Sequence, residues 1–489
     1  MKHHTLKNWF CICLLFIIIG FAYADNSTQN IEYESYNNFL ENAAKDYRVP
    51  GLALAVFDDE KITYTFTHDI SESGNPIEID TPFFLGSTTK TFTALCIMIL
   101  NEKGLLNIED PVKKYLDGFY FKDDSISPGA TNNITLEQLL NHTSGISQRG
   151  IPGTGIGERS LQEELLLLNK SKLMYAPGST YEYCNVNYRL LGLIIETVTG
   201  KRYGSVLDEE IFQPLSMQHS YSHPSDAAGL AEGHGQIFGF LILRNQKFYP
   251  GALPSGYLIS SASDIAALLI EELRASQGRS KVFSSELIES TWNVPQNIES
   301  NYAKGWMKAD KGDGTSFLIH GGSVENYQSF FCIDPSAKKG FVLLMNQGGL
   351  FPMINTFNTI RDELILKLIY QEEHPYTSKK NINFLNTIIP VLVLIFQAVL
   401  FLVLFFRRHL FWNRKIFSKI SIGLNIFWCV FFLFMFTPLM NAVMGDTASL
   451  SLIGTMIPEL FVTILIIVIS NALRAGIKTL LLLSRRITQ

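Results

Sequence analysis

The chain has 489 residues with 47% hydrophobic and 17% charged content, and its formal net charge at pH 7 is -5. The length allows more than one domain, and a small acidic excess with no basic block outside the apolar ends argues against nucleic acid as a partner. The apolar residues are concentrated near the two ends, so the middle of the chain has the composition of an ordinary soluble protein.

The first 24 residues have the features of a secretory signal peptide. A basic head precedes a short apolar run over residues 9–22, and Ala22-Tyr23-Ala24 fits the small-x-small pattern of a cleavage site. The run is too short to cross a bilayer comfortably as a helix. We therefore predict a signal peptide at residues 1–24 and a mature chain that begins near Asp25, with an uncleaved N-terminal anchor as the alternative.

Residues 25–376 form the predicted soluble domain. Strand and helix patterns follow one another without regular β-α-β alternation, which predicts an α+β domain with mostly antiparallel strands. The predicted strands are 52–57, 62–66, 316–320, 328–333 and 341–345, of which the first two form a hairpin. The predicted helices are 88–103, 187–198, 262–275 and 355–370, with Gly200 ending the second and Ser261 marking the start of the third.

The cysteines give no sign of a disulfide framework or a metal site. Four remain after removal of the signal peptide, far apart and without paired ligand spacing: Cys96, Cys184, Cys332 and Cys429. A chain of this size can bury a sufficient core without cross-links.

A Ser-x-x-Lys sequence from Ser87 to Lys90 opens an apolar helix. The spacing places Lys90 beside Ser87 on one face of the first turn, where free backbone N–H groups face any developing anion. A lysine buried there loses its charge more easily, so its amine can accept the serine proton and make the hydroxyl nucleophilic. The same Ser-x-x-Lys pattern from Ser336 to Lys339 falls in a predicted surface turn. A single match to this pattern is more often an N-cap serine with a solvated lysine.

Two later motifs supply partners for this serine. Tyr183-Cys184-Asn185 lies just before a predicted helix, where the tyrosine can relay protons and the asparagine can bind a substrate amide. His320-Gly321-Gly322 ends a predicted strand, and its glycines allow the backbone to approach a substrate closely. The N–H groups of Ser323 and Ser87 then form a candidate oxyanion hole. Each motif alone also fits a structural role, as a core tyrosine with a capping asparagine or as a Gly-Gly turn.

Together, Ser87-Thr88-Thr89-Lys90, Tyr183-Cys184-Asn185 and His320-Gly321-Gly322 resemble the signature elements of the penicillin-recognising serine hydrolases, specifically the class C β-lactamase and D,D-peptidase branch. The resemblance covers residues 47–347. It implies an antiparallel sheet flanked by helices, a helical subdomain and an active site between them. It also implies a covalent acyl-enzyme on Ser87, Lys90 as general base and Tyr183 as proton relay, without a metal or another cofactor.

Two positions depart from the family pattern. His320 replaces the lysine of the usual Lys-Thr-Gly, so the positive charge that would hold a substrate carboxylate is weaker or depends on pH. This departure argues against efficient β-lactam hydrolysis. Cys184 replaces a more usual serine or alanine and is predicted to fill space, because no histidine motif accompanies it.

Three apolar stretches follow a linker at residues 377–383, at 384–406, 420–440 and 450–472, and each is close to the roughly 20 residues that cross a bilayer as a helix. Lysine and arginine gather between the first two stretches and after the third, which places these parts in the cytoplasm and the soluble domain outside. Residues 384–489 are therefore predicted to be a membrane domain with three transmembrane helices. Pro458 directly precedes Glu459, which indicates that the third helix begins later than residue 450. Glu459 is therefore expected at the outer edge of this helix.

These patterns predict a multi-pass protein of a bacterial cytoplasmic membrane with its catalytic domain on the extracytoplasmic side and its C-terminus in the cytoplasm. The resemblance implies a hydrolase of D-amino-acid-containing amides or esters of the cell envelope, whose substrate is a small peptide, ester or β-lactam-like molecule. One alternative is a prodrug-activating peptidase that removes an N-acyl-D-amino-acid cap from a secondary metabolite. Another is a β-lactam sensor or binding module that does not turn over.

Overall fold

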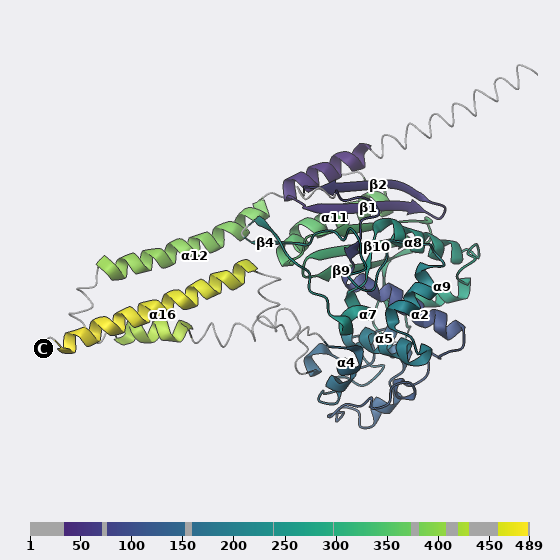
Figure 1. Cartoon of the computed structure of the whole chain (residues 1–489), viewed down its shortest axis with the longest axis horizontal. Helices are drawn as coiled ribbons and strands as arrows, with labels where there is room; N and C mark the ends of the chain where they lie inside the picture. The colour runs from purple at the N-terminus through teal and green to yellow at the C-terminus, as the bar shows by residue number, and fades with distance from the viewer. Residues whose placement is uncertain are drawn as a thin grey trace, which may run out of the picture.

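The computed structural model describes residues 34–70, 76–151, 159–237, 239–296, 298–372, 381–406, 419–429 and 458–487. The predicted signal peptide lies outside these ranges, as do most of the predicted linker and residues 430–457 between the second and third predicted spans. The described residues comprise an α+β domain and a set of long helices that extend from one side of it (Figure 1).

A seven-stranded antiparallel sheet forms the centre of the domain, in the order β2-β1-β11-β10-β9-β8-β7. Its strands are β1 (Gly51–Asp58), β2 (Ile62–Asp69), β7 (Tyr302–Ala303), β8 (Trp306–Asp310), β9 (Ser316–Val324), β10 (Tyr327–Asp334) and β11 (Lys339–Met345). The opening hairpin and the three late strands confirm the sequence prediction. The sequence prediction did not include β7 and β8. In addition, β9 continues past its predicted end at His320, because Gly321 and Gly322 still pair with β10.

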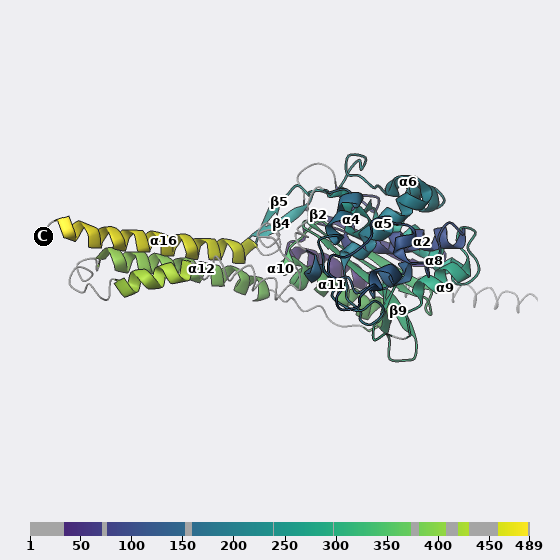
Figure 2. The same ribbon diagram turned by 90° about the horizontal axis from the view of Figure 1, so that it is seen from below.

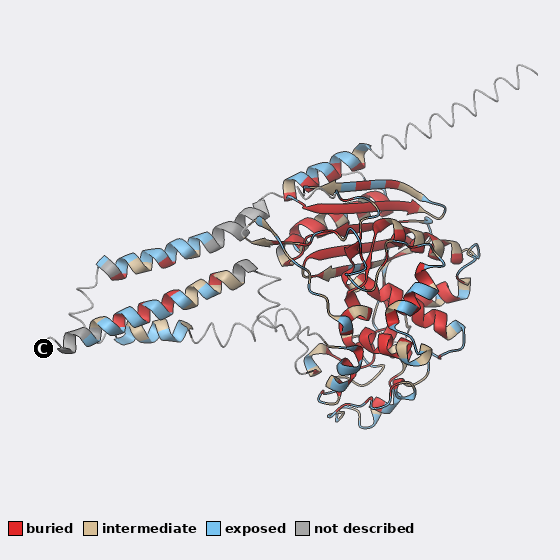
Figure 3. Ribbon diagram, in the orientation of Figure 1, coloured by how far each residue is buried: buried red, intermediate tan, exposed pale blue. Residues whose placement is uncertain are grey.

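The sheet lies between two layers of helices, and β1 is buried on both faces. Its alternate side chains belong to two hydrophobic clusters, Ala53, Ala55 and Phe57 in one and Leu52, Leu54 and Val56 in the other. A strand with two buried faces has a continuous apolar sequence, as this one does. Figure 3 shows the buried central strands and the exposed outer sides of the flanking helices.

The first cluster joins the sheet to α2 (Thr89–Glu102), α5 (Asn185–Thr199) and α8 (Ala262–Ala275), all close to their predicted positions. α5 ends where Gly200 adopts a left-handed φ of 69° and its N–H donates to the carbonyl of Glu196. The second cluster joins the opposite face to a helix at 34–47 and to α11 (Asn358–Ile365). The predicted final helix is confirmed, but π-helical turns at Met353–Phe357 and Leu366–Tyr370 flank α11.

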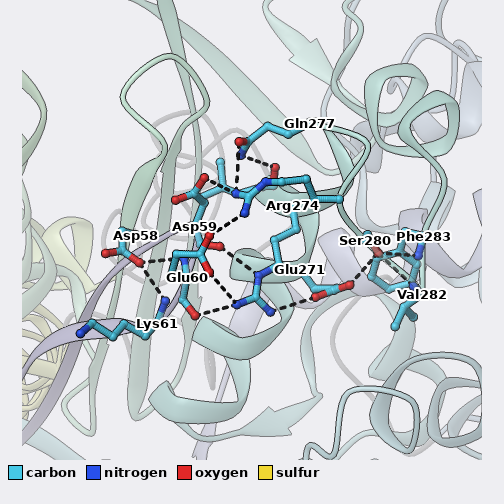
Figure 4. Close-up of polar contacts among 12 residues, drawn as sticks. Asp58, Asp59, Glu60, Lys61, Glu271, Arg274, Gln277, Ser280, Val282 and Phe283 are labelled. Carbon is cyan, nitrogen blue, oxygen red and sulfur yellow. Dashed lines mark hydrogen bonds and ion pairs between the residues drawn. The ribbon is translucent and has the colours of Figure 1, made fainter.

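Polar contacts fasten the β1–β2 turn to the end of α8 (Figure 4). Arg274 of α8 donates to the backbone carbonyls of Asp59 and Glu60, at 2.9 and 2.7 Å. Arg279 forms ion pairs with the carboxylates of the same two residues. Within the turn, Asp58 accepts a hydrogen bond from the N–H of Glu60 at 2.7 Å. The edge of the sheet is thereby tied to the helical layer that carries the candidate site.

The tail consists of α12 (Asn381–Phe406), a helix at 419–429 and α16 (Pro458–Ile487). α12 and α16 lie side by side (Figures 1 and 2). By length and apolar composition, one segment of the described residues can cross a membrane, Phe461–Leu481, whereas the apolar part of α12 is shorter. One candidate membrane helix is supported, and the three-span arrangement stays a prediction.

α16 covers the described part of the third predicted span and continues past its predicted end at residue 472. α16 begins at Pro458, which lacks an N–H and is well suited to a first helical turn, and it continues to Ile487. Glu459 accordingly lies in the first turn, as Pro458 predicted. The prediction ended at residue 472 because charged residues follow, but Arg474 and Lys478 are buried among the helices, and Lys478 Nζ donates to Ser421 Oγ at 2.7 Å.

Candidate active site

Ser87 and Lys90 meet at the start of α2. Ser87 lies in a 3-10 turn, Gly86–Thr88, which leads directly into the helix. Lys90 is completely buried, and its Nζ lies 3.1 Å from Ser87 Oγ. Two more acceptors hold the amine, Asn185 Oδ1 at 2.7 Å and the carbonyl oxygen of Ser255 at 2.6 Å. The three-residue spacing thus brings serine and lysine together, while Ser255, in the short helix α7 (Leu253–Gly256), is a partner that the sequence did not indicate.

The surroundings of Lys90 favour its neutral form. Burial lowers the pKa of Lys90 well below its ordinary value, and the positive charge of Arg189 lowers it further. Arg189 is itself buried and forms an ion pair with Glu164 at 2.8 Å, and Arg159 approaches the same carboxylate at 3.1 Å. A lysine with a lowered pKa can accept a proton at neutral pH, as a general base must.

Tyr183 lies next to this amine, with the centre of its ring 4.9 Å from Lys90 Nζ. The residue is 39% exposed, so one part of Tyr183 faces the solvent while its ring lies against the buried lysine. Desolvation raises the pKa of Tyr183, and a hydrogen bond with Ser87 opposes this rise. The phenol is therefore protonated at neutral pH and suited to donate a proton, while Lys90 is suited to accept one.

A cluster of aromatic rings holds Tyr183 in place. Its ring packs on His142 at a centroid distance of 4.4 Å and on Tyr302 at 6.1 Å. His142 Nδ1 accepts a hydrogen bond from the N–H of Cys184 at 3.3 Å and lies 3.0 Å from Nδ2 of Asn187. These contacts fix the backbone directly after Tyr183 and, with it, the direction of the phenol.

His142 is a site residue that the motifs did not identify. It is fully buried, with a left-handed φ of 57°. Burial and the nearby charge of Lys90 lower the pKa of His142 well below its ordinary value, so the imidazole is neutral. The segment 139–146 resembles a family segment, but nothing in its pattern indicates contact with Tyr183, which follows 41 positions later.

Close backbone contact places β9 against the serine turn. A Cβ atom at Gly322 would overlap the Leu85 carbonyl oxygen and lie 3.0 Å from the backbone nitrogen of Ser87. Gly86 has a φ of 57°, and a Cβ atom there would overlap the backbone nitrogen of Ser323. The two glycines therefore allow the Ser87 and Ser323 amides to come together, where two N–H donors can stabilise an oxyanion.

His320 lies on the same strand but is only 3% exposed. Its Nε2 is 3.2 Å from the hydroxyl of Tyr302, and its Nδ1 is 2.9 Å from the carbonyl oxygen of Gly321. Burial, followed by the nearby charge of Lys90, lowers the pKa of His320 to about 3. The imidazole is therefore uncharged across the neutral range. The sequence predicted a positive charge that is either weaker than that of lysine or dependent on pH, and the structure favours an uncharged group at neutral pH.

The structure thus gathers the predicted residues around one serine. Partly or fully exposed groups border the solvent there: Ser87, Tyr183, Asn185, Gly321 and Ser323. Lys90 and His320 lie buried beneath them, and Cys184 is 1% exposed, consistent with a space-filling role. The arrangement brings together a serine hydroxyl, a lysine amine, a phenol and two backbone N–H groups, which are the kinds of group that a serine hydrolase requires.

Known proteins are similar to this chain in sequence or in fold. The chain is 24% identical over 327 residues to Protein flp of Staphylococcus aureus, an alignment that covers 65% of this chain and 64% of that protein. It is 28% identical over 328 residues to the unguisins hydrolase ungD' of Aspergillus campestris, covering 62% and 59% of the two chains. The fold is similar to a D-stereospecific amidohydrolase from Streptomyces sp., with a TM-score of 0.53, 23% identity and coverage of 64% and 94%.

The chain therefore spans less than two thirds of the curated relatives that it matches. Its residues 36–362, well over half of the chain, match the sequence profile of the family described as Beta-lactamase. The matched range contains every element that places a group at the serine site. The chain belongs to the Beta-lactamase family of serine hydrolases.

Proposed function

We propose that this protein is a membrane-anchored extracytoplasmic hydrolase that cleaves amide or ester bonds of D-amino-acid-containing substrates through an acyl-enzyme on Ser87. One observation carries the proposal. Lys90 Nζ lies 3.1 Å from Ser87 Oγ in a fully buried position where the pKa of the lysine is lowered, which is the arrangement needed to activate a serine hydroxyl.

In the first step, Ser87 Oγ forms a bond to the substrate carbonyl carbon while its proton moves to Lys90. The carbonyl oxygen becomes an oxyanion and accepts hydrogen bonds from the N–H groups of Ser87 and Ser323. Tyr183 then donates its proton to the leaving amine or alcohol and takes one from Lys90, so that proton and leaving group depart together. In the second step, water attacks the acyl-enzyme carbonyl in the same way, and the acid is released while Ser87 is restored.

The neutral His320 narrows the class of substrate. Because its pKa is near 3 and Tyr302 occupies its Nε2 side, His320 supplies no charge for a carboxylate next to the scissile bond. We therefore favour substrates whose leaving part carries no free carboxylate at that position. Asn185 gives its Oδ1 to Lys90, which leaves its Nδ2 to donate to a substrate amide.

The substrate proposal draws on the relatives as well. The likeness to a D-stereospecific amidohydrolase supports amide cleavage and the D-configuration, and the unguisins hydrolase supports a hydrolytic outcome. The neutral His320 also favours a second candidate, removal of an N-acyl-D-amino-acid cap. In such a substrate, the leaving group is the rest of a larger molecule, which has no free carboxylate next to the scissile bond.

Membrane anchoring is supported by the apolar segment Phe461–Leu481 of α16, which is long enough to cross a bilayer. The basic residues after this segment favour a cytoplasmic C-terminus, with the catalytic domain on the other side.

The test is a time course of intact mass on the full chain in detergent, with penicillin and, separately, with matched D- and L-amino-acid anilides. The parent chain, Ser87→Ala and Ser336→Ala are compared. We expect a covalent adduct and faster release of aniline from the D-substrate in the parent and in Ser336→Ala, and neither in Ser87→Ala.

The outcomes separate the candidate functions. An adduct that persists without turnover of any substrate would favour the sensor or binding module. Turnover of an N-acyl-D-amino-acid anilide, added as a third substrate, without turnover of the anilides that have a free amine would favour the cap-removing peptidase. Absence of both adduct and turnover in folded protein would contradict the serine mechanism.

A further inference from the structure

A small apolar hairpin stands apart from the main sheet. It consists of β4 (His234–Ile237) and β5 (Phe240–Leu243), which pair with each other. Its first residue, His234, also forms an isolated parallel bridge, to Gln347 just after β11. Phe240 is 70% exposed and Leu243 is 59% exposed, more than any other large apolar side chain among the described residues before position 373. The hairpin therefore presents an apolar surface that the rest of the described domain does not cover.

The residue pattern of β5 does not suit a hairpin in water. A solvated antiparallel strand alternates polar and apolar residues, whereas β5 reads Phe-Leu-Ile-Leu and has no polar face. Phe240 and Leu243 point to opposite faces of the strand, because their spacing is odd, and both are exposed. An apolar environment that reaches both faces of the hairpin explains this pattern.

The position of the hairpin indicates what that environment is. β4 contacts α16. Figures 1 and 2 show the hairpin at the end of α16 nearest the catalytic domain, opposite the marked C-terminus. The candidate membrane segment Phe461–Leu481 begins at this end. The apolar hairpin is therefore level with the point where α16 would enter a bilayer from the outside.

The hairpin is also fastened to the rim of the serine site. After β5, the carbonyl oxygen of Arg244 accepts a hydrogen bond from Asn326 Nδ2 at 3.3 Å, and Gln246 Oε1 accepts one from the N–H of Asn326 at 3.2 Å. Gln246 also donates to Glu325. Glu325 and Asn326 form the β9–β10 turn, directly after the strand that carries the Ser323 amide. The position of the hairpin is therefore coupled to that of the site.

We propose that the β4–β5 hairpin inserts its apolar side chains into the outer interface of the bilayer that α16 crosses, and that this second contact holds the serine site at the membrane surface. The occupant of the apolar surface is the lipid bilayer itself. The interfacial layer accepts aromatic and aliphatic side chains and also tolerates polar neighbours such as Arg244. This inference rests on the proposed membrane anchoring but not on the proposed substrate.

The test places an environment-sensitive fluorophore on Phe240→Cys in the full chain, reconstituted into phosphatidylcholine–phosphatidylglycerol vesicles that contain nitroxide-labelled lipid. Leu105→Cys is the matched control, since Leu105 is 51% exposed and follows α2, which lies on the side of the domain away from α12 and α16 (Figure 1). The parent chain, labelled in parallel, corrects for native cysteines. Leu243→Cys provides a second position should Phe240→Cys fold poorly.

We expect several-fold stronger quenching at positions 240 and 243 than at 105, together with a blue-shifted emission. Equal quenching at all three positions in vesicle-bound protein would overturn the proposal while leaving the membrane anchoring intact. Shielding at 240 without quenching by lipid would assign the surface to a protein partner and overturn it as well. Release of the chain from the vesicles by alkaline extraction would overturn both the anchoring and the hairpin contact.

Discussion

Two segments of this chain read Ser-x-x-Lys, and the structure places them in very different settings. In the first, Lys90 is fully buried and lies 3.1 Å from Ser87. In the second, Ser336 is exposed on the turn between β10 and β11, and its hydroxyl donates to Asp334 at 2.6 Å. The hydroxyl at the turn is satisfied by a carboxylate, whereas the hydroxyl at the helix is in contact with an amine.

The difference shows that the Ser-x-x-Lys motif alone does not activate a serine. Activation also requires burial of the lysine and a neighbouring strand that covers the serine turn. At Ser87, the apolar helix α2 buries the lysine and the backbone of β9 closes over the turn. At Ser336, neither an apolar helix nor a facing strand removes the side chains from water. The following predictions test this contrast, from the largest expected effect to the smallest.

Lys90→Met should lower the rate of acylation by about 10²- to 10⁴-fold, because the proton acceptor for Ser87 is lost. Lys339→Met, the matched change in the second segment, should leave the rate unchanged. The measurement is the acylation rate by stopped flow, with circular dichroism to check folding. A Lys90→Met rate within tenfold of the parent would contradict the role of the amine.

The pH dependence of the parent sharpens the same point. A general base acts only when it is unprotonated, so kcat/KM should rise with pH through the lowered pKa of Lys90. It should level off below about pH 10.4, the ordinary lysine value. A limb that continued to rise up to that value would show that Lys90 behaves as a solvated lysine.

Gly322→Ala should reduce kcat/KM by about 10²- to 10³-fold, the effect of losing an oxyanion-hole donor. The new Cβ overlaps the Leu85 carbonyl oxygen and Ser329 Oγ, so the strand and the serine turn must separate. Gly321→Ala is the matched control, because a Cβ there meets only Phe330 Cδ2 at 3.8 Å. The contrast in kcat/KM between the two variants is the measurement, and equal effects would argue against a close contact at position 322.

His320→Gln should make the protein less sensitive to acid. The folded-state pKa of His320 is about 3, below the unfolded value of about 6.5, so the unfolded chain binds more protons between these values. Stability is therefore lost as pH falls from about 6.5 towards 3, by up to about 1.4 kcal/mol per pH unit for one histidine.

The measurement is the free energy of unfolding at several pH values for parent and variant. A shallower slope in His320→Gln is expected. The residual slope includes His142, whose pKa is also lowered. Identical slopes would mean that folding does not lower the pKa of His320, and the argument for substrates without a carboxylate would fail.

Ser336→Ala should cost less than about 1 kcal/mol of stability and leave activity unchanged. Asp334 keeps its ion pair with Lys311 at 2.8 Å and its bond from the N–H of Ala337 at 3.0 Å. Thermal unfolding measures the effect. A loss of several kcal/mol would show that the turn contributes more to the fold than its exposure indicates.

Much of the fold was predictable because its signals are local. The turn between β1 and β2 is polar and short, and α8 begins at an N-cap serine and runs over the residues predicted. Ser261 accepts from the N–H of Asp264, but the carboxylate of Asp264 does not complete a capping box and instead accepts from the N–H of His219 and from Ser220 Oγ. That choice depends on a distant segment, which local spacing does not reveal.

The sequence alone determined the family, the serine and lysine pair and the order of the elements. Each of these depends on local signals: the start of a helix, its apolar faces and three short motifs. The tertiary structure decided what surrounds them. His142 and Ser255 reach Tyr183 and Lys90 from segments far away in the chain, and Tyr302 reaches His320 from a different strand. It also decided that His320 is uncharged and that two glycines bring β9 onto the serine turn. Burial and backbone approach arise only when separate segments pack, so no local pattern encodes them.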